Sequence, residues 1–464
     1  MSVESLINFF EPQGVVIAGA RRSAGFGYGI PLFLQHHGWG DRLHLVNPAG
    51  GELHGLNVYK RVGDVPDPVD LAIVIVPASA VPGVMEEIGE RGIKNVIIES
   101  AGFAETGSDG LALQERAKTI AGKYGMRVIG PNCVGVVNTV NRFASVELIE
   151  ESLTPGPVSI IAQSGVFGNI LLDHLHECGL YVSKAVTLGN RIDVNESDVL
   201  DYLNDDPLTR VIMLYLEGAA DGPRLRESLN RVSKNKPVLI LKSGRTAAGK
   251  RATASHTGSM SGQDNIYTAV FAQTGAIRAE SLSQLIDFAR VFATQPPARG
   301  NRLGILTTSG SLGALATDVA EANGLVLPPL SSSTVDRVRE IAPGWMNVKN
   351  PLDLGPSGNY NRLLTMLLDD PEIDMALAIM VIPYAVVRTF KALGLQMKEW
   401  YGDIASTRRQ FPDKPMLIAV VGHHEYAADI AAMSGQSIPV FDSPERAAQA
   451  LVALWRYSET RKKL

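Results

Sequence analysis

Small and polar residues surround one histidine, His256, in the segment 242–262, which reads KSGRTAAGKRATASHTGSMSG. The hydroxyl and backbone N–H groups beside this histidine can donate hydrogen bonds to phosphate oxygens. Positive charge is supplied by Lys242, Arg245, Lys250 and Arg251. A histidine that faces bound phosphate can act as a nucleophile and carry the phosphoryl group, although a solvated surface histidine explains the same residues. The composition predicts a flexible loop outside the core, after an apolar strand at 238–241.

Two further polar residues, Ser164 and Glu217, each follow an apolar stretch of strand composition, at 158–162 and 210–216. The residues Ser164, Gly165 and Val166 begin a predicted helix, whose first N–H groups are unpaired and form a phosphate site by geometry. A carboxylate at the carboxyl end of a parallel strand lies at the active rim, where it could orient a histidine by accepting a hydrogen bond. An ordinary serine N-cap and a helix-capping glutamate are the alternatives.

The first 150 residues alternate between strand and helix patterns. After a strand that begins near Gly14, strands are predicted at 43–46, 71–76, 96–98 and 128–129, with helices at 81–91 and 110–123. This alternation predicts a parallel, doubly wound sheet whose ligands bind at the carboxyl ends of the strands.

The turn after the first strand is rich in glycine, which would let the backbone approach a pyrophosphate. Its glycines are Gly19, Gly25, Gly27 and Gly29. Arg21 or Arg22 could pair with the phosphate charge. The turn by itself fits NAD, CoA and no ligand about equally well. The second strand ends in VNPAGG without an acidic residue, which disfavours NAD.

Two stretches that contain proline and glycine divide the chain, LTPGP at 153–157 and TQPPARG at 294–300. The predicted domains are therefore 1–152, 153–298 and 299–464. The second and third domains open similarly, with IIAQSGVFG and ILTTSGSLG, which predicts two α/β domains of related design. In the third domain, strands are predicted at 375–381 and 416–421, and a final helix from residue 443.

The composition is that of a globular protein. Of 464 residues, 45% are hydrophobic and 20% charged, and the net charge of −5 indicates neither a nucleic-acid groove nor a basic membrane face. Two cysteines are too few for a disulfide framework, and the histidines lack the spacing of metal ligands, so no metal site is predicted. Without a signal-peptide pattern or about 18 uninterrupted apolar residues, we expect a soluble, cytoplasmic protein.

The histidine segment resembles the phosphohistidine segment of the NDP-forming acyl-CoA synthetases, a family whose relatives include the α subunit of succinyl-CoA synthetase. The shared pattern is K-S-G-R-T-x-x-G-x-x-A-x-x-S-H-T-G, which begins at Lys242. The QSG of 163–165 and the YLEG of 215–218 are similar to two further segments of that family. The resemblance implies that His256 is transiently phosphorylated and that Glu217 orients it. It also implies that the segment beginning at Ser164 holds the phosphohistidine.

The first domain resembles the CoA-binding domains of the same family. The similar motifs are GARR at 19–22, VNP at 46–48, VPA at 76–78 and IGPNCVG at 129–135. Glu99 falls where the family's fourth strand borders the thioester-forming end of CoA. Arg21 stands where serine is usual, and Ala49 where a CoA-contacting lysine is common. The CoA-binding residues that the resemblance implies are Gly19, Ala20, Arg21, Arg22, Gly25, Asn47, Pro48, Val76, Pro77, Ala78, Glu99 and Asn132.

The resemblance covers almost the whole chain and implies the α subunit of an ADP-forming acetate–CoA ligase, or of a close relative that acts on another carboxylic acid. The implied reaction interconverts acid, CoA and ATP with acyl-CoA, ADP and phosphate, through an acyl phosphate and a phosphohistidine at His256. The implied fold is an N-terminal Rossmann-like CoA-binding domain followed by two flavodoxin-like, parallel-sheet domains.

The sequence shows no plausible ATP-grasp module, so the resemblance implies that ATP or ADP and Mg²⁺ bind to a partner β subunit, in an α2β2 hetero-oligomer. The third domain carries SGSLG at 309–313 where the family has G-G-P-G, and we expect it to serve mainly in subunit docking. Two rival functions are an NAD-linked oxidoreductase and a catalytically inactive acyl-CoA-binding regulatory protein. The latter would be expected to lose the histidine or its partner, whereas His256, Glu217 and Ser164 are all present.

Overall fold

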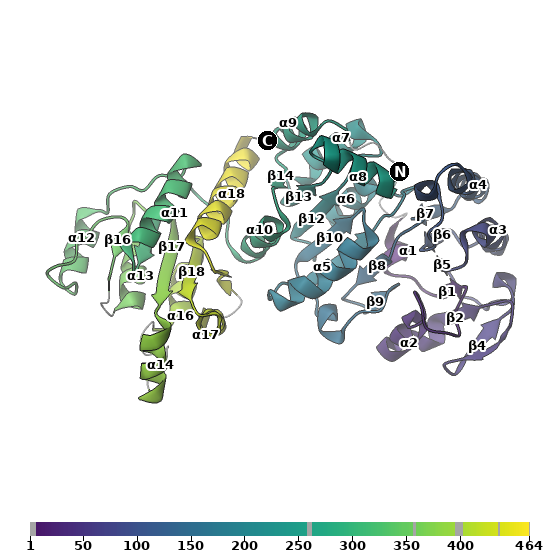
Figure 1. Cartoon of the computed structure of the whole chain (residues 1–464), viewed down its shortest axis with the longest axis horizontal. Coiled ribbons are helices and arrows are strands. Elements are labelled where there is room, and N and C mark those ends of the chain that lie inside the picture. Colours follow the sequence, from purple (N-terminus) through teal and green to yellow (C-terminus); the bar gives the residue numbers. More distant parts are fainter. Residues whose placement is uncertain (1–5, 258–261, 356–358, 395–401, 435–436, 464) are drawn as a thin grey trace. The chain divides into compact units, whose positions relative to one another are not determined.

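The computed structural model of the chain describes residues 6–257, 262–355, 359–394, 402–434 and 437–463 (Figure 1). The chain divides into two compact units, Met1–Glu280 and Ser281–Leu464. The first unit contains two seven-stranded sheets, and the second contains a five-stranded sheet. Within the described residues, every helix is too short or too polar to cross a bilayer.

The first sheet has the strand order β3-β4-β2-β1-β5-β6-β7. Its strands are β1 (Val15–Ala18), β2 (Leu43–Val46), β3 (Gly51–Leu53), β4 (Leu56–Tyr59), β5 (Leu71–Val74), β6 (Asn95–Ile98) and β7 (Arg127–Ile129). All neighbours pair in parallel except β3 and β4, which form an antiparallel hairpin at the edge. Numbered along the chain without β3, the order is 3-2-1-4-5-6, which is the Rossmann order.

Helices cover both faces of this sheet. They are α1 (Ile7–Phe10), α2 (Ile30–Leu34), α3 (Val81–Arg91) and α4 (Ser108–Tyr124). Helix α3 has apolar residues at helical spacing and ends at Gly92, whose left-handed conformation (φ 87°) closes the helix. Met85 and Ile88 of α3 share one core with Val74 and Val96 of the sheet. The core on the other face is continuous with the core of the second sheet, which explains why the two sheets form one unit.

The second sheet has the order β14-β13-β12-β10-β11-β8-β9. Its strands are β8 (Gly135–Asn138), β9 (Phe143–Ala144), β10 (Val158–Ala162), β11 (Val182–Thr187), β12 (Val211–Leu216), β13 (Val238–Lys242) and β14 (Ile277–Ala279). The strands from β10 to β14 are parallel and follow the flavodoxin order 2-1-3-4-5. Strands β8 and β9 extend the sheet in antiparallel pairing and precede residue 152, so the first 152 residues contribute to both sheets.

The second sheet is flanked by α5 (Gly165–Glu177), α6 (Glu196–Asp205), α7 (Gly222–Val232), α8 (Ala247–Thr257) and α9 (Asp264–Thr274). Helix α8 lies inside the segment that the sequence predicted to be a flexible loop, so that prediction was wrong for 247–257. The physical reason is its content of alanine, lysine and arginine, which are strong helix formers and outweigh the single Gly249. Thr246 precedes the helix and accepts a hydrogen bond from the Gly249 N–H (3.0 Å). Residues 258–261 lie outside the described residues.

The third sheet has the order β16-β15-β17-β18-β19, again 2-1-3-4-5 with parallel pairing. Its strands are β15 (Leu303–Thr307), β16 (Leu352–Asp353), β17 (Met375–Ile382), β18 (Met416–Gly422) and β19 (Val440–Phe441). Its helices are α10 (Leu282–Thr294), α11 (Gly310–Ala322), α12 (Ser332–Arg339), α13 (Tyr360–Asp369), α14 (Tyr384–Ala392), α16 (Ile404–Gln410), α17 (His424–Ser434) and α18 (Pro444–Lys463). The expected fold, one Rossmann-like and two flavodoxin-like sheets, is confirmed. The division at 152/153 and 298/299 stays a prediction.

The second and third sheets share details that go beyond strand order. Lys236 donates to the carbonyls of Leu203 and Asp206 (2.6 Å each), at the carboxyl end of α6. In the third sheet, Lys414 donates to the carbonyls of Leu368 and Asp370 (2.6 and 3.0 Å), at the carboxyl end of α13. Each lysine precedes a proline that leads into the fourth strand of its sheet. The two sheets are therefore structural repeats that can be compared residue by residue.

One buried ion pair tests how the second sheet is stabilised. Lys184 on β11 and Asp206 lie 2.9 Å apart, with side chains 4% and 6% exposed. Burial opposes ionisation of Asp206, but the hydrogen bonds from Lys184 and Thr209 outweigh it and lower the pKa. The pair therefore stabilises the fold above the ordinary pKa of aspartate, and this contribution is lost as the pH falls through the lowered pKa.

We expect Lys184→Met to destabilise the chain by about 3–5 kcal/mol, because it leaves a buried carboxylate without its cation. The urea-unfolding midpoint measures the loss. The control is Glu150→Gln, which breaks the exposed pair between Arg142 and Glu150 (2.9 Å) and should cost about 1 kcal/mol or less. Equal midpoints for the two variants would contradict the assignment.

Candidate active site

A cavity of about 440 Å³ lies where the carboxyl ends of strands from the first two sheets meet. It is lined by Phe26, Glu99, Ser100, Ala101, Asn132, Cys133, Val134, Gln163, Ser164, Gly165, Gly189 and Asn190. Four of the predicted site residues are among them: Glu99, Asn132, Ser164 and Gly165. The fold thus brings the expected thioester end of the CoA site next to the expected phosphate site.

Glu99, which follows β6, is the most deeply buried acid of this cavity, at 4% exposure. Neither carboxyl oxygen makes a hydrogen bond of ordinary geometry with a described residue. Burial raises the pKa of Glu99 well above its ordinary value; the Ser145 hydroxyl offsets this in part, and the charge of Glu147 adds to it. The same burial, with the charge of Glu99, raises the pKa of the Cys133 thiol, so this cysteine is a poor nucleophile. A buried carboxyl with a raised pKa suits proton transfer.

Ser164 is the N-cap residue of α5, yet its hydroxyl does not cap the helix. Ser164 thus lacks the side-chain hydrogen bond of an ordinary serine N-cap, and its phosphate role stays a prediction. Ser164 and Gly165 line the cavity, so α5 begins at its wall. The helix dipole and the first N–H groups of the helix favour an anion at this point. Val166 lies in the first turn of α5, and its side chain lies outside the described residues.

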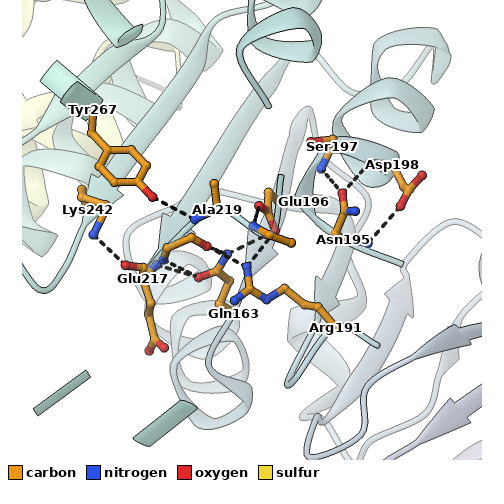
Figure 2. Close-up of polar contacts among 12 residues, drawn as sticks. Gln163, Arg191, Asn195, Glu196, Ser197, Asp198, Glu217, Ala219, Lys242 and Tyr267 are labelled. Carbon is orange, nitrogen blue, oxygen red and sulfur yellow. Dashed lines mark hydrogen bonds and ion pairs between the residues drawn. The ribbon is translucent and has the colours of Figure 1, made fainter. Parts of the chain in front are cut away.

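Glu217 follows β12 and is 4% exposed. The Gln163 side chain fixes its backbone: the amide oxygen accepts from the N–H groups of Glu217 (2.7 Å) and Gly218 (3.1 Å), and the amide nitrogen donates to the Gly218 carbonyl (2.8 Å). Figure 2 shows the Glu217 side chain directed away from this amide. The backbone of Glu217 is thus held from one side while its carboxylate extends on the other.

A buried ion pair between Arg191 and Glu196 contacts Gln163 and the backbone that it holds. Arg191, held in the left-handed conformation (φ 59°), donates to Glu196 (3.1 Å) and to the Gly218 carbonyl (2.6 Å). Glu196 in turn accepts from Gln163 (3.2 Å) and from the Ala220 N–H (2.9 Å). These contacts converge on the backbone after β12 (Figure 2). The segment 217–220 is therefore fixed by Gln163 after β10, by Arg191 in the loop after β11 and by Glu196 at the start of α6.

Lys242 ends β13 and is 3% exposed. Its ammonium donates to the Glu217 carbonyl (2.6 Å) and to the Ser243 carbonyl, and lies 4.7 Å from the centre of the Tyr267 ring. The Tyr267 hydroxyl accepts from the Ala219 N–H (2.9 Å). Burial lowers the pKa of Lys242 to about 8, against the opposing charge of Asp264.

The backbone of His256 lies near the end of α8, and its side chain lies outside the described residues. Two of the four basic residues expected around it have other roles. Lys242 is buried against carbonyl oxygens, and Arg245 forms ion pairs with Glu280 and Asp264. That the four residues supply positive charge for an anion stays a prediction, and two of the four charges are also engaged at the base of the segment.

The residues expected to bind CoA in the first turn lie at the same edge of the first sheet but do not line the cavity. Gly19 (φ 99°) packs so closely on Ile75 that a Cβ atom would lie 2.3 Å from its carbonyl oxygen, so this position requires glycine. Arg22 donates to the carbonyls of Gly50 and Glu52 and so fixes the β3–β4 hairpin. Arg21 is exposed and lies over Gly25.

The end of β2 is tied to this turn. Asn47 donates to the Ala20 carbonyl (3.0 Å) and accepts from the Ala49 N–H (3.0 Å), which places Pro48 at the edge of the turn. Asn47 directly follows the second strand, where NAD enzymes use an acidic residue. Its side chain is thus engaged in hydrogen bonds with the backbone. Val76, Pro77 and Ala78 follow β5, and Ala78 lies against Gly102 beyond β6.

Sequence reasoning missed several site residues, among them Arg191, Glu196, Asn190 and Tyr267. Their contacts join residues far apart in the chain, so no local pattern predicts them. Gln163 could have been found, because it precedes Ser164 at the end of a buried strand. Among the described residues, no group of three or more His, Cys, Asp or Glu side chains could hold a metal ion.

Two family models match the chain. A CoA binding domain matches residues 13–139, and a succinyl-CoA ligase like flavodoxin domain matches residues 155–292. Acetate–CoA ligase [ADP-forming] I subunit alpha of Pyrococcus furiosus is 36% identical and aligns over 100% of this chain and 99% of its own length. Acetate–CoA ligase [ADP-forming] of Methanocaldococcus jannaschii is 35% identical over 96% of this chain, which spans 62% of that longer protein.

A solved structure agrees with these matches. The dinucleotide forming acetyl-coenzyme A synthetase 1 of Ca. Korarchaeum cryptofilum, in complex with phosphate and ADP, superposes with a TM-score of 0.88. It is 30% identical, and the match covers 98% of this chain and 97% of that one. Similarity of sequence and fold over the whole length, with the expected CoA and phosphate elements around one cavity, shows that the chain belongs to the family of ADP-forming acetate–CoA ligase α subunits.

Proposed function

We propose that the chain is the α subunit of an NDP-forming acyl-CoA synthetase that interconverts acid, CoA and ATP with acyl-CoA, ADP and phosphate. The observation that carries the proposal is the single cavity in which Glu99 and Asn132 of the CoA-binding domain face Ser164 and the start of α5. A thioester and a phosphate bound at these two walls would meet, as the first chemical step requires.

In that step, a phosphate oxygen attacks the acyl carbonyl of acyl-CoA, the C–S bond breaks, and an acyl phosphate and the CoA thiol form. The N–H groups at the start of α5 stabilise the phosphate charge. The imidazole of His256 then attacks phosphorus, the bond between phosphorus and the acyl oxygen breaks, and the carboxylate leaves. Glu217 holds the other ring nitrogen, so that the attacking nitrogen is unprotonated and the developing positive charge is stabilised.

Glu99 acts as the general base and general acid for the CoA thiol. As CoA attacks an acyl phosphate, the S–H bond must break, and the Glu99 carboxylate takes the proton as the C–S bond forms and phosphate leaves. In the reverse direction it returns that proton to sulfur. The absence of ordinary hydrogen bonds to its oxygens among the described residues leaves the carboxyl available for this exchange.

The nucleotide reaction takes place on a partner in this proposal. The chain aligns end to end with a protein named as an alpha subunit, and spans 62% of a longer relative, which supports a separate β subunit. That subunit would bind ADP or ATP with Mg²⁺ through an ATP-grasp fold, in an α2β2 assembly. The third sheet would serve mainly in docking, and the segment carrying His256 would move between the two sites.

The central experiment incubates the chain with acetyl-CoA and radiolabelled phosphate. We expect CoA-thioester-dependent label that is alkali-stable and acid-labile, as a phosphohistidine is, and that passes to ADP only when the β subunit is added. His256→Asn should take up no label, because the nucleophilic nitrogen is gone. Label that persists in this variant, or that forms without acetyl-CoA, would contradict the assignment.

Glu217→Gln should slow phosphorylation of His256 by up to about 10⁴-fold, the loss found when the orienting carboxylate of a catalytic triad is replaced by an amide. The fold should be retained, because the backbone contacts of residue 217 with Gln163 and Lys242 do not involve its carboxylate. Rapid-quench labelling with acetyl-CoA and phosphate measures the rate, and thermal unfolding provides the control. A wild-type labelling rate would rule out the orienting role.

Glu99→Gln should lower thioester formation from acetyl phosphate and CoA by about 10²–10⁴-fold, because the base is lost. Since burial raises the pKa of Glu99, the carboxyl stays protonated at low pH, and the wild-type rate should rise with pH through that raised pKa. The variant should lose this rise. Labelling of His256 by acetyl phosphate, which needs no thiol proton transfer, is the control and should remain near wild type.

A further inference from the structure

Lys242 presents a cation to the protein interior, and among the described residues its contacts include no carboxylate. It is 3% exposed, and its described contacts are two carbonyl oxygens and the Tyr267 ring. Burying an ammonium group is costly unless it is well paired, so a fold tends to keep one only where it has a task. The carbonyls that it joins belong to Glu217 and to Ser243, the residue that opens the histidine segment.

The third sheet shows what the same architecture does without that lysine. In the second sheet, β10 pairs with β12 so that Ala162 faces Tyr215, and β12 pairs with β13 so that Leu216 faces Lys242. In the third sheet, the equivalent pairings are Thr307 with Ile379, and Met380 with Val420. Lys242 therefore corresponds to Val420, which is buried at 3% exposure.

The same registers place Val381 at the position of Glu217. The scaffold around it is kept, because the Thr308 hydroxyl accepts from the Val381 N–H (2.9 Å) as the Gln163 amide oxygen accepts from the Glu217 N–H (2.7 Å). Both charged residues are thus replaced by valine in the repeat whose corresponding stretch, from Gly422, lacks the KSGRT…SHTG pattern, although His423 and His424 follow its strand. The architecture therefore forms without either charge. Lys242 and Glu217 occur together in one repeat and are replaced together in the other.

We propose that Lys242 is a positioning residue for phosphoryl transfer. Its ammonium group binds the Glu217 carbonyl and the Ser243 carbonyl and so fixes the two backbone segments next to each other. Helix α8 begins four residues after Ser243, so this contact sets both the orienting carboxylate and the base of the segment that carries His256. The proposal rests on the proposed role of His256. It assigns to Lys242 no contact with substrate.

The charge on Lys242 gives the proposal a pH signature. The groups that face it are Glu217, Asp264, Tyr267, Arg278 and Lys250. Burial lowers the pKa to about 8; the charges of Arg278 and Lys250 act in the same direction, whereas those of Asp264 and Glu217 oppose it. Loss of the proton replaces two charge-assisted hydrogen bonds by weaker ones. The positioning should therefore weaken as the pH rises through about 8.

Lys236 is a matched control at the opposite end of β13. It also donates to two carbonyl oxygens, and burial lowers its pKa too, but its partners lie at the carboxyl end of α6, near the amino end of the strand. Lys236→Met and Lys242→Met each leave two carbonyls without a donor, so both should lower the melting temperature comparably. Only the second should affect chemistry.

The experiment measures labelling of His256 by acetyl-CoA and radiolabelled phosphate, in the full chain with its β subunit, from pH 6 to 10. Lys242→Met should be slowed about 10- to 100-fold, as expected of a misplaced catalytic group, and should lose the alkaline decline with a midpoint near 8. Lys242→Arg, which stays charged, should shift that decline to higher pH. Lys236→Met should keep the wild-type rate and profile.

Ionisation of phosphate and CoA affects all variants alike, so the informative quantity is the difference between profiles. A wild-type rate and profile in Lys242→Met would overturn the positioning role, and so would equal slowing by Lys236→Met, which would indicate a structural role alone. If the wild-type chain itself takes up no label on His256, the proposed function fails instead, and the two failures are distinguished.

Discussion

One buried amide, the side chain of Gln163, joins the carboxyl ends of β10 and β12. These neighbouring strands are the point at which the chain reverses its direction across the sheet, where parallel sheets form their binding crevices. Ser164 follows Gln163 directly in sequence. Glu217, at the end of β12, donates its backbone N–H to the Gln163 amide oxygen. Gln163 is 2% exposed, and a buried polar group is stabilising only when it is fully hydrogen-bonded. Glu196 accepts a hydrogen bond from its amide nitrogen, and Arg191 donates to the same Gly218 carbonyl as Gln163 does.

Burial acts on two charges of the site in opposite directions. It raises the pKa of the Glu99 carboxyl and lowers the pKa of the Lys242 ammonium, so both move toward the neutral range. Each can then change protonation state under conditions in which ordinary acids and lysines cannot. The difference between them lies in their contacts: Glu99 faces the cavity, whereas Lys242 is engaged by backbone carbonyls. The first is placed for proton exchange and the second for holding structure.

The sequence allowed a good prediction of the parts governed by local patterns. The strands at 43–46 and 158–162 and the helix at 81–91 have the predicted bounds, because apolar periodicity and glycine or proline boundaries act within a few residues. The segment 247–257 was misjudged, since its small residues resemble a loop, while its alanines favour a helix. The antiparallel β8 was missed because its partner β11 is distant in sequence, with Gly135 paired to Thr187 and Asn138 to Lys184, and β9 was missed with it because it pairs only with β8.

The candidate site divides in the same way. Ser164, Glu99 and Asn132 were located by short motifs, and the fold gathers them around one cavity. Gln163, Arg191 and Lys242 act through backbone groups of residues distant in sequence, so their roles required the three-dimensional structure. A repeat within the chain then supplied what a single sequence does not, a second copy of the architecture in which two of the charges are absent.

The pairing of β8 with β11 has a consequence for how such enzymes are inherited and recombined. The hairpin formed by β8 and β9 belongs by sequence to the CoA-binding portion and by hydrogen bonding to the next sheet, and Asn138 and Asn141 anchor it to the Phe10 carbonyl (3.0 and 2.9 Å). A chimera spliced between the two portions would strip that sheet of its outer ribbon and leave β11 as an open edge, a site for aggregation. Residues 1–280 therefore form a single exchangeable block, which carries both walls of the cavity together.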